Sequence, residues 1–342
     1  MAVPDPSLVR RCSVDEAVAL LASPDATEAL SLAHGVAALL VEGADEWPDE
    51  ALSRRQRQTL EWLPCVTVAP CAGPSWRRFD VVADEGAPAG VGTEALVDAV
   101  AAHPRSAVAL VRLVRAARRS DPLTGLWAES VTYGLLQGGS EFAEWRATTP
   151  AGAPGPPGDV VVERSARGSE VVLDRPTRHN ALDVSLRDAL VDALRAVAAG
   201  AEDEPVVLRG RGPSFCSGGD LAEFGSFADP VAAHLVRSTR LPARAVLDVR
   251  HRLTAEVHGA CVGAGVELAA FAAKVVADPA TTFRLPEVGM GLVPGSGGTW
   301  SLTHRIGSQR TNWLALTGSS VGVGTAERWG LVDDVSTATL DG

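Results

Sequence analysis

Apolar positions in the second half of the chain form short runs that alternate with segments of helical periodicity. Short apolar runs bounded by polar or turn-forming residues are typical of buried strands. The sequence therefore predicts strands at Glu170–Asp174, Pro205–Arg209, Leu253–His258 and Val275–Asp278. Strands and helices in alternation indicate an α/β fold, in which the loops at strand ends commonly carry the binding groups.

Two helices are predicted between these strands. The first is capped by Asn180 and ends at Gly200. Its apolar face repeats at helical spacing and consists of Leu182, Leu186, Leu190, Leu194 and Val197. The second follows the turn Gly263–Gly265 and is rich in alanine as far as Ala273. Each helix thus connects one predicted strand to a later one.

A segment rich in proline and glycine divides the chain. Residues 150–158 contain four prolines and three glycines, a composition that cannot continue a helix or the interior of a sheet. We therefore predict an N-terminal region over residues 1–149, a linker over 150–158 and a core over 159–342. The N-terminal region has helical periodicity between His103 and Ala147. Before it come three runs of strand type, Val36–Val41, Leu63–Val68 and Phe79–Asp84.

Charge and composition exclude several classes of function. A net charge of −11 over 342 residues argues against nucleic acid or an anionic membrane surface as a partner. The five cysteines and seven histidines lack the spacing of a metal site, so no metal is expected. No run approaches the roughly 18 apolar residues of a membrane span, and the N-terminus has no apolar leader. We expect a cytoplasmic protein.

Three glycine-rich segments carry the candidate chemistry. Glu267 lies in His258–Ala269 and Glu287 in Phe283–Gly298, while Gly212–Leu221 turns through glycine after a predicted strand. Because glycine lets backbone amides approach a ligand closely, such segments favour binding through N–H groups. Two carboxylates beside one substrate can divide the work of acid and base. The sequence therefore predicts a catalytic pair of glutamates.

In this order and spacing, these segments resemble the crotonase (enoyl-CoA hydratase/isomerase) superfamily. The resemblance covers residues 159 to about 335 and implies a spiral of ββα repeats, assembled as a homotrimer or as a hexamer of paired trimers. It is carried by Leu173–Leu182, Phe215–Leu221, Gly263–Glu267, Leu285–Val288, Pro294–Thr299 and Ala326–Asp333.

The resemblance implies a site for an acyl thioester. The backbone N–H groups of Gly219 and Ala264 would form an oxyanion hole, and Ala264 begins a predicted helix, where N–H groups are unpaired. Glu267 is assigned to the attacking water and Glu287 to the α-carbon of the substrate. CoA is expected as part of the substrate, without any cofactor. The implied contacts to substrate or CoA are Ser217, Gly218, Asp220, Gly263, Gly265, Pro286 and Gly295.

Other polar and aromatic residues allow two interpretations. Arg284 either contacts an acidic group of the substrate or forms a surface ion pair. Trp300 is expected to pack in the core, and His258 to be a buried structural residue. Specificity is expected to lie in a loop region over Glu223–Arg250. The candidate phosphate contacts, which can equally be solvated charges, are Arg175, Arg178, Arg209 and Arg211.

The C-terminal end of the sequence departs from the superfamily, whose members continue with helices that cover the site. We expect the helical stretch between His103 and Ala147 to provide this cover. The N-terminal region would then be a degenerate crotonase copy that lends its closing helices to the active second copy. An unrelated helical domain is the alternative.

The expected activity is that of a lyase that hydrates or dehydrates an α,β-unsaturated acyl thioester. The substrate is bound to CoA or to a carrier protein. Isomerisation, thioester hydrolysis and biosynthetic dehydration are alternatives because they use the same oxyanion site. A non-catalytic accessory protein with the crotonase fold is a further alternative, and retention of both glutamates argues against it.

Overall fold

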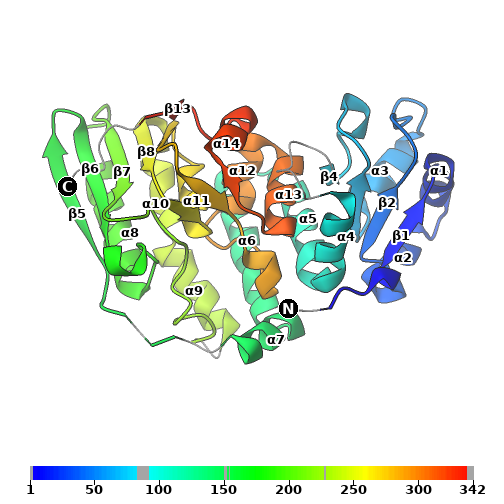
Figure 1. Cartoon of the computed structure of the whole chain (residues 1–342), viewed down its shortest axis with the longest axis horizontal. Coiled ribbons are helices and arrows are strands. Elements are labelled where there is room, and N and C mark those ends of the chain that lie inside the picture. The colour runs from blue at the N-terminus through cyan, green and yellow to red at the C-terminus, as the bar shows by residue number, and fades with distance from the viewer. Residues whose placement is uncertain (1–2, 83–91, 150–151, 154, 227–228, 337–342) are drawn as a thin grey trace.

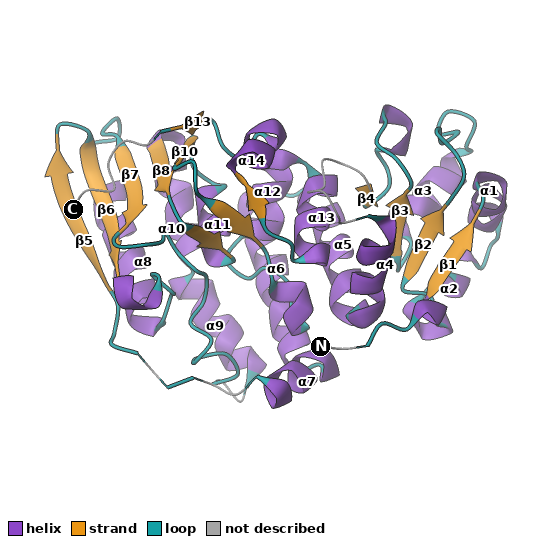
Figure 2. Ribbon diagram, viewed as in Figure 1, coloured by secondary structure: helices purple, strands orange, loops and turns teal. Residues whose placement is uncertain are grey.

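The computed structural model describes residues 3–82, 92–149, 152–153, 155–226 and 229–336 (Figures 1 and 2). The molecule is elongated, with one sheet at each end and helices in most of the middle. Residues 150, 151 and 154 of the predicted linker and residues 83–84 of the third N-terminal strand lie outside the described residues. Within the described ranges no helix is long and apolar enough to cross a membrane.

The N-terminal half forms a parallel sheet in the order β1-β2-β3-β4. β2 (Ala38–Val41) and β3 (Val66–Ala69) are buried throughout, as expected of strands that are apolar apart from Thr67. β4 is Val81–Val82, and the edge strand β1 (Val9–Cys12) has two exposed arginines, so an apolar run does not reveal it. The helices are α1 (Val14–Ala22), α2 (Ala26–Ala29), α3 (Arg54–Trp62), α4 (Thr93–Ala102), α5 (Pro104–Ala117), α6 (Pro122–Gln137) and α7 (Ser140–Thr148).

The C-terminal half contains a six-stranded sheet in the order β13-β10-β8-β7-β6-β5 and a small sheet in the order β12-β11-β9. β5 (Asp159–Ser165) and β6 (Gly168–Asp174) are antiparallel, and the other pairs of the large sheet are parallel. Its remaining strands are β7 (Val206–Gly210), β8 (Leu253–Val257), β10 (Lys274–Ala277) and β13 (Asp334–Val335). The small sheet consists of β9 (Ala260–Val262), β11 (Thr282–Arg284) and β12 (Val321–Gly322).

All four strands predicted in this half are present, and the α/β class is confirmed. The region 223–250, expected to be a loop, instead forms two helices over most of its length. The helices of this half are α8 (Val184–Ala198), α9 (Pro230–Arg240), α10 (Pro242–Val249), α11 (Ala264–Ala269), α12 (Gly298–Ile306), α13 (Ser308–Thr317) and α14 (Val323–Trp329).

Two predicted helix ends are wrong. Asp183, rather than Asn180, caps α8, since its side chain accepts the N–H of Leu186. Asn180 lies before the helix with a φ of 52°, a conformation that asparagine tolerates. Its amide instead donates to nearby backbone carbonyls. α11 ends at Ala269 rather than Ala273, because the N–H of Ala273 bonds to the carbonyl of Arg250.

The two halves share one apolar core, and their helices meet in the middle of the molecule (Figure 1). α4, α5 and α6 pack against α12 and α13. Polar bonds reinforce this contact: Trp300 Nε1 donates to the carbonyl of Ser120, and Asn312 Nδ2 donates to that of Asp80. The helices predicted between His103 and Ala147 are present and cover the C-terminal half. Descent of the N-terminal half from a crotonase copy remains a prediction.

Candidate active site

Two parallel strands of the small sheet bring the glutamates together. β9 leads into α11 and Glu267, and its neighbour β11 leads into the short 3-10 helix Glu287–Met290. Gly263 joins the two strand ends by donating its N–H to the carbonyl of Arg284. Gly263 has a φ of +52°, and a Cβ there would lie 2.7 Å from Glu287 Oε1. Glycine is therefore required where the carboxyl group of Glu287 meets the start of α11.

Glu267 is held at the beginning of α12. Its Oε2 accepts the N–H of Ser296 at 2.7 Å and that of Gly298 at 2.8 Å. The side chain is 1% exposed, and burial raises its pKa to about 7, while these N–H groups and that of Gly295 act to lower it. The carboxyl group of Glu267 can therefore change its protonation state near neutral pH.

Glu287 has a different environment. Its Oε2 is buried without a hydrogen-bond partner among the described residues. Burial raises the pKa of Glu287 well above its ordinary value, and the nearby charges of Glu267 and Glu129 raise it further. The raised pKa favours the protonated form of Glu287, and one of its oxygens is free for a ligand.

Gly219 and Ala264 line the same cavity as the two glutamates. Ala264 is the first residue of α11, where an N–H group has no intrahelical acceptor. Within the described part of the chain, neither the N–H of Gly219 nor that of Ala264 has a hydrogen-bond acceptor. The site thus combines two free donors with two carboxyl groups of raised pKa.

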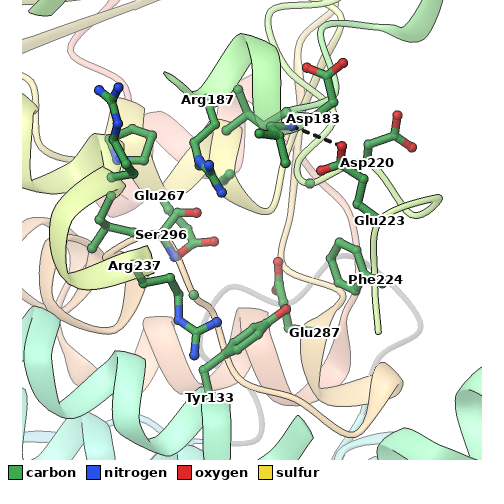
Figure 3. Close-up of a pocket in the computed structure, with 18 of the residues that line it drawn as sticks. Tyr133, Asp183, Arg187, Asp220, Glu223, Phe224, Arg237, Glu267, Glu287 and Ser296 are labelled. Atoms are coloured by element: carbon green, nitrogen blue, oxygen red, sulfur yellow. Dashed lines mark hydrogen bonds between the residues drawn. The ribbon is translucent and has the colours of Figure 1, made fainter. Parts of the chain in front are cut away.

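The site lies where two hollows meet. One, the narrow cavity, measures about 190 Å³ and contains both glutamates, Gly219 and Ala264 (Figure 3). The other, the wide cleft, measures about 930 Å³ and is bordered by Ser217, Gly218 and the helix α7. Both are lined by Gly219, Phe224 and Glu287. A ligand that occupies both hollows must pass these three residues.

The structure distributes the predicted contact residues between these hollows. Asp220 and Gly295 line the narrow cavity, and Ser217, Gly218, Gly263 and Pro286 line the wide cleft. Gly265 lines neither hollow and packs against the backbone of Cys216.

The candidate phosphate contacts are already engaged with acidic groups. Arg175 is 3% exposed and binds Asp220 at 2.7 Å and Asp183 at 3.3 Å. This burial excludes Arg175 as a phosphate contact in this conformation. Arg209 binds Glu163 and Glu170, and Arg211 binds Glu163 and Asp174, while Arg178 lies 3.6 Å from Asp220.

The contacts of His258, Trp300 and Arg284 show how each of these residues is used in the fold. His258 is buried, and its Nε2 lies 2.8 Å from the carbonyl of Gly212, as expected of a structural histidine. Trp300 packs in the core, stacked on Phe271 and His304. Arg284 donates its Nε–H to the carbonyl of Gly318, and no ion pair of Arg284 occurs among the described residues.

The N-terminal half contributes a third buried glutamate to the site, beside Glu267 and Glu287. The sequence pattern did not identify it as a site residue. Glu129 of α6 is 1% exposed and accepts the N–H of Gly297 at 2.6 Å and that of Thr299 at 2.9 Å. Burial and the charge of Glu267 raise its pKa to about 8. In the sequence Glu129 is a single acidic residue in a helix with apolar residues on several sides, and only the packing of α6 on α12 distinguishes it.

Comparison with known proteins assigns a family to the C-terminal half of the chain. The model of the family "Enoyl-CoA hydratase/isomerase" matches residues 164–340. The chain belongs to this family. The 2,3-dehydroadipyl-CoA hydratase of Escherichia coli is 34% identical over 183 residues, which cover 53% of this chain and 71% of that protein. An enoyl-CoA isomerase/hydratase of Mycosarcoma maydis is 31% identical over 175 residues, or 48% of this chain and 64% of that protein.

Solved structures of family members align over the same share of the chain. An enoyl-CoA hydratase subunit from Geobacillus kaustophilus is 30% identical, with a TM-score of 0.48, covering 52% of this chain and 68% of that one. The enoyl-CoA hydratase of Thermoplasma volcanium is 29% identical, with a TM-score of 0.47, and the match covers 52% of this chain and 71% of that one. Across the described residues no three His, Cys, Asp or Glu side chains are arranged to hold a metal ion.

Proposed function

We propose that this member of the enoyl-CoA hydratase/isomerase family is a lyase that adds water to an α,β-unsaturated acyl thioester or removes it. The observation that carries the proposal is the lining of the narrow cavity, where Glu267 and Glu287 lie with the free N–H groups of Gly219 and Ala264. Such donors stabilise the negative charge that develops on a thioester oxygen when water attacks the β-carbon.

The two hollows suggest how the substrate lies. The thioester carbonyl binds at Gly219 and Ala264, where the hollows meet. The long CoA arm occupies the wide cleft, along Ser217, Gly218, Gly263 and Pro286, and the acyl group occupies the narrow cavity. A carrier-protein thioester has the same reactive arm and is the alternative form of the substrate.

The environments of the glutamates suit different steps. Glu267 receives N–H groups on one oxygen, which favours its anion, so it takes a proton from the water that attacks the β-carbon. The resulting enolate oxygen is held by Gly219 and Ala264. Glu287, protonated, then gives its proton to the α-carbon. Water has been added across the double bond, and both carboxyl groups regain their starting states by proton exchange with solvent.

The experiment is turnover of a panel of 2-enoyl-CoA and 3-hydroxyacyl-CoA thioesters, followed through the absorbance of the conjugated enoyl group. Loss of that absorbance with formation of the hydroxyacyl product supports hydration. A shifted double bond or free CoA as product would instead favour isomerisation or thioester hydrolysis, which the same oxyanion site can catalyse. If neither turnover nor CoA binding occurs, the protein is a non-catalytic accessory protein rather than a lyase.

We further propose a homotrimer or a hexamer of paired trimers, working in the cytoplasm. The family resemblance supports this assembly. Light scattering of the full chain in solution tests it, and a monomer at micromolar concentration would exclude it.

A further inference from the structure

One wall of the narrow cavity carries polar side chains that have no role in the proposed hydration. α6 contributes Tyr133 and Gln137 to it, and α9 contributes Arg237. The guanidinium carbon of Arg237 lies 4.9 Å from the centre of the Tyr133 ring. Figure 3 shows Arg237 and Tyr133 next to each other, with the Tyr133 hydroxyl directed towards Glu287. This wall faces the space that we assign to the acyl group.

Arg237 has side-chain N–H groups without an acceptor among the described residues. Its Nε–H bonds to Ser130 Oγ at 2.9 Å, one Nη2–H to the carbonyl of Ser130 at 3.2 Å, and one Nη1–H to Gln137 Oε1 at a long 3.4 Å. A guanidinium carries five N–H groups, so two remain without a partner among the described residues.

The positive charge of Arg237 also has no ion-pair partner among the described residues. Arg187 and Arg240 line the same cavity, but each is paired with an aspartate, Asp188 and Asp192 respectively. Arg237 has no such ion pair in the described ranges, and its partial burial lowers its pKa. Because desolvating an unpaired cation is unfavourable, an anionic ligand at Arg237 would relieve this cost.

The acidic residues of the cavity do not prevent an anion from entering. Asp183 and Asp220 are bound by Arg175, and burial raises the pKa of Glu287. Glu267, which lines the same cavity, accepts the backbone N–H groups of Ser296 and Gly298. Glu223 accepts the N–H of Val184, and burial raises its pKa. Negative charge near Arg237 is therefore smaller than the number of carboxyl groups suggests.

We infer that the acyl group of the substrate ends in a carboxylate, which Arg237 binds through its two free N–H groups with Tyr133 as an additional donor. This inference rests on the proposed function, since it takes the narrow cavity as the acyl site. A guanidinium and a carboxylate match as a planar, two-bonded pair. The volume of about 190 Å³ limits the substrate to a short chain between thioester and carboxylate.

The test compares two six-carbon 2-enoyl-CoA thioesters, one ending in a carboxylate and the other, hex-2-enoyl-CoA, in a methyl group. We expect kcat/KM of the wild type to favour the carboxylated substrate by at least about tenfold, as a charged hydrogen bond allows. Arg237→Met should abolish this preference, and Arg237→Lys should retain part of it. Arg244→Met, which removes an exposed arginine paired with Asp248 on α10, should leave the preference unchanged.

A binding measurement separates this inference from the proposed function. Calorimetry with the saturated analogues, adipyl-CoA and hexanoyl-CoA, requires no turnover. Tighter binding of adipyl-CoA by the wild type, lost in Arg237→Met, supports the carboxylate site even if no enoyl-CoA is hydrated. Equal or weaker binding of adipyl-CoA by the wild type overturns it, whatever the activity, and needs no variant that could fail to fold.

Discussion

Glu129 and Glu267 bind alternate N–H groups at the start of one helix. Glu267 accepts those of Ser296 and Gly298, and Glu129 accepts those of Gly297 and Thr299. One glutamate comes from each half of the chain, so the position of the candidate catalytic carboxyl group depends on a helix of the N-terminal half. Placing two carboxyl groups at a helix N-terminus also uses the positive end of its dipole.

Replacing either candidate catalytic glutamate should abolish most hydration. We expect Glu267→Gln and Glu287→Gln each to lower kcat by about 10²- to 10⁴-fold, because a positioned acid or base contributes that much. Glu327→Gln, on an exposed position of α14, is the matched control. Steady-state kinetics with the best substrate of the panel measure the effect. Near wild-type rates in either variant would remove that residue from the mechanism.

Glu129→Gln should reduce stability and leave the acid limb of the pH profile in place. An amide offers one acceptor where the carboxylate offers two, so one buried N–H of Gly297 or Thr299 is left unpaired, at a cost of about 1–3 kcal/mol. The pKa of Glu129, about 8, lies above that of Glu267, about 7, so Glu129 is largely uncharged while Glu267 ionises, and the acid limb of kcat/KM should stay at the same pH. Chemical denaturation and a pH series provide the two readouts. A shifted acid limb would instead show that Glu129 carries charge when Glu267 ionises.

Stability should decrease as pH rises through the neutral range. Glu267 and Glu129 have folded-state pKa values of about 7 and about 8, above the ordinary 4.5. Below pH 4.5 both are protonated in either state, and as pH rises the unfolded chain loses its protons first. Their stabilising contribution is therefore lost between about pH 4.5 and pH 8, by at most about 1.4 kcal/mol per group and pH unit. Melting temperatures from pH 5 to 9 test this, and a flat or rising curve would contradict it.

Gly298→Ala should displace the carboxyl group of Glu267. A Cβ at this position would lie 2.5 Å from Glu267 Cγ, so the side chain must move. Because a shift of about 1 Å in a reacting group can cost about 100-fold, we expect a comparable fall in kcat. At Gly322 an added Cβ meets no atom within 4 Å, so Gly322→Ala is the control. Equal activities of the two variants would show that the position of Glu267 is not critical.

The C-terminal half should not be soluble without the N-terminal helices. Residues 156–342 alone would expose the faces of α12 and α13 that α4, α5 and α6 cover, including the buried Trp300. Exposed apolar surface of this kind promotes aggregation. We expect insoluble protein from this fragment and recovery on co-expression with residues 1–155. A soluble, folded fragment would show that the helices are not needed for closure.

Local pattern accounts for the parts of the fold that depend on neighbouring residues. The strands β6 and β7 follow from short apolar runs, because burial on both faces leaves few polar positions. In β8, buried Leu253, Ala255 and Val257 alternate with half-buried Thr254 and Glu256, which is also a strand pattern. The cap of α8 was misplaced because Asn180 and Asp183 are both good capping residues. Only the contacts of Asn180 with the loop 211–215 distinguish them.

The α/β class, the family and the glycine-rich segments that carry Glu267 and Glu287 are evident from the sequence alone. These features are encoded by residues close together in the chain. In contrast, Tyr133 and Arg237 line the cavity, and Glu129 binds the start of α12 beside Glu267, only once the chain is folded. Their environments arise from packing of α6 and α9 around a distant loop, and burial, free N–H groups and raised pKa values are properties of that packing.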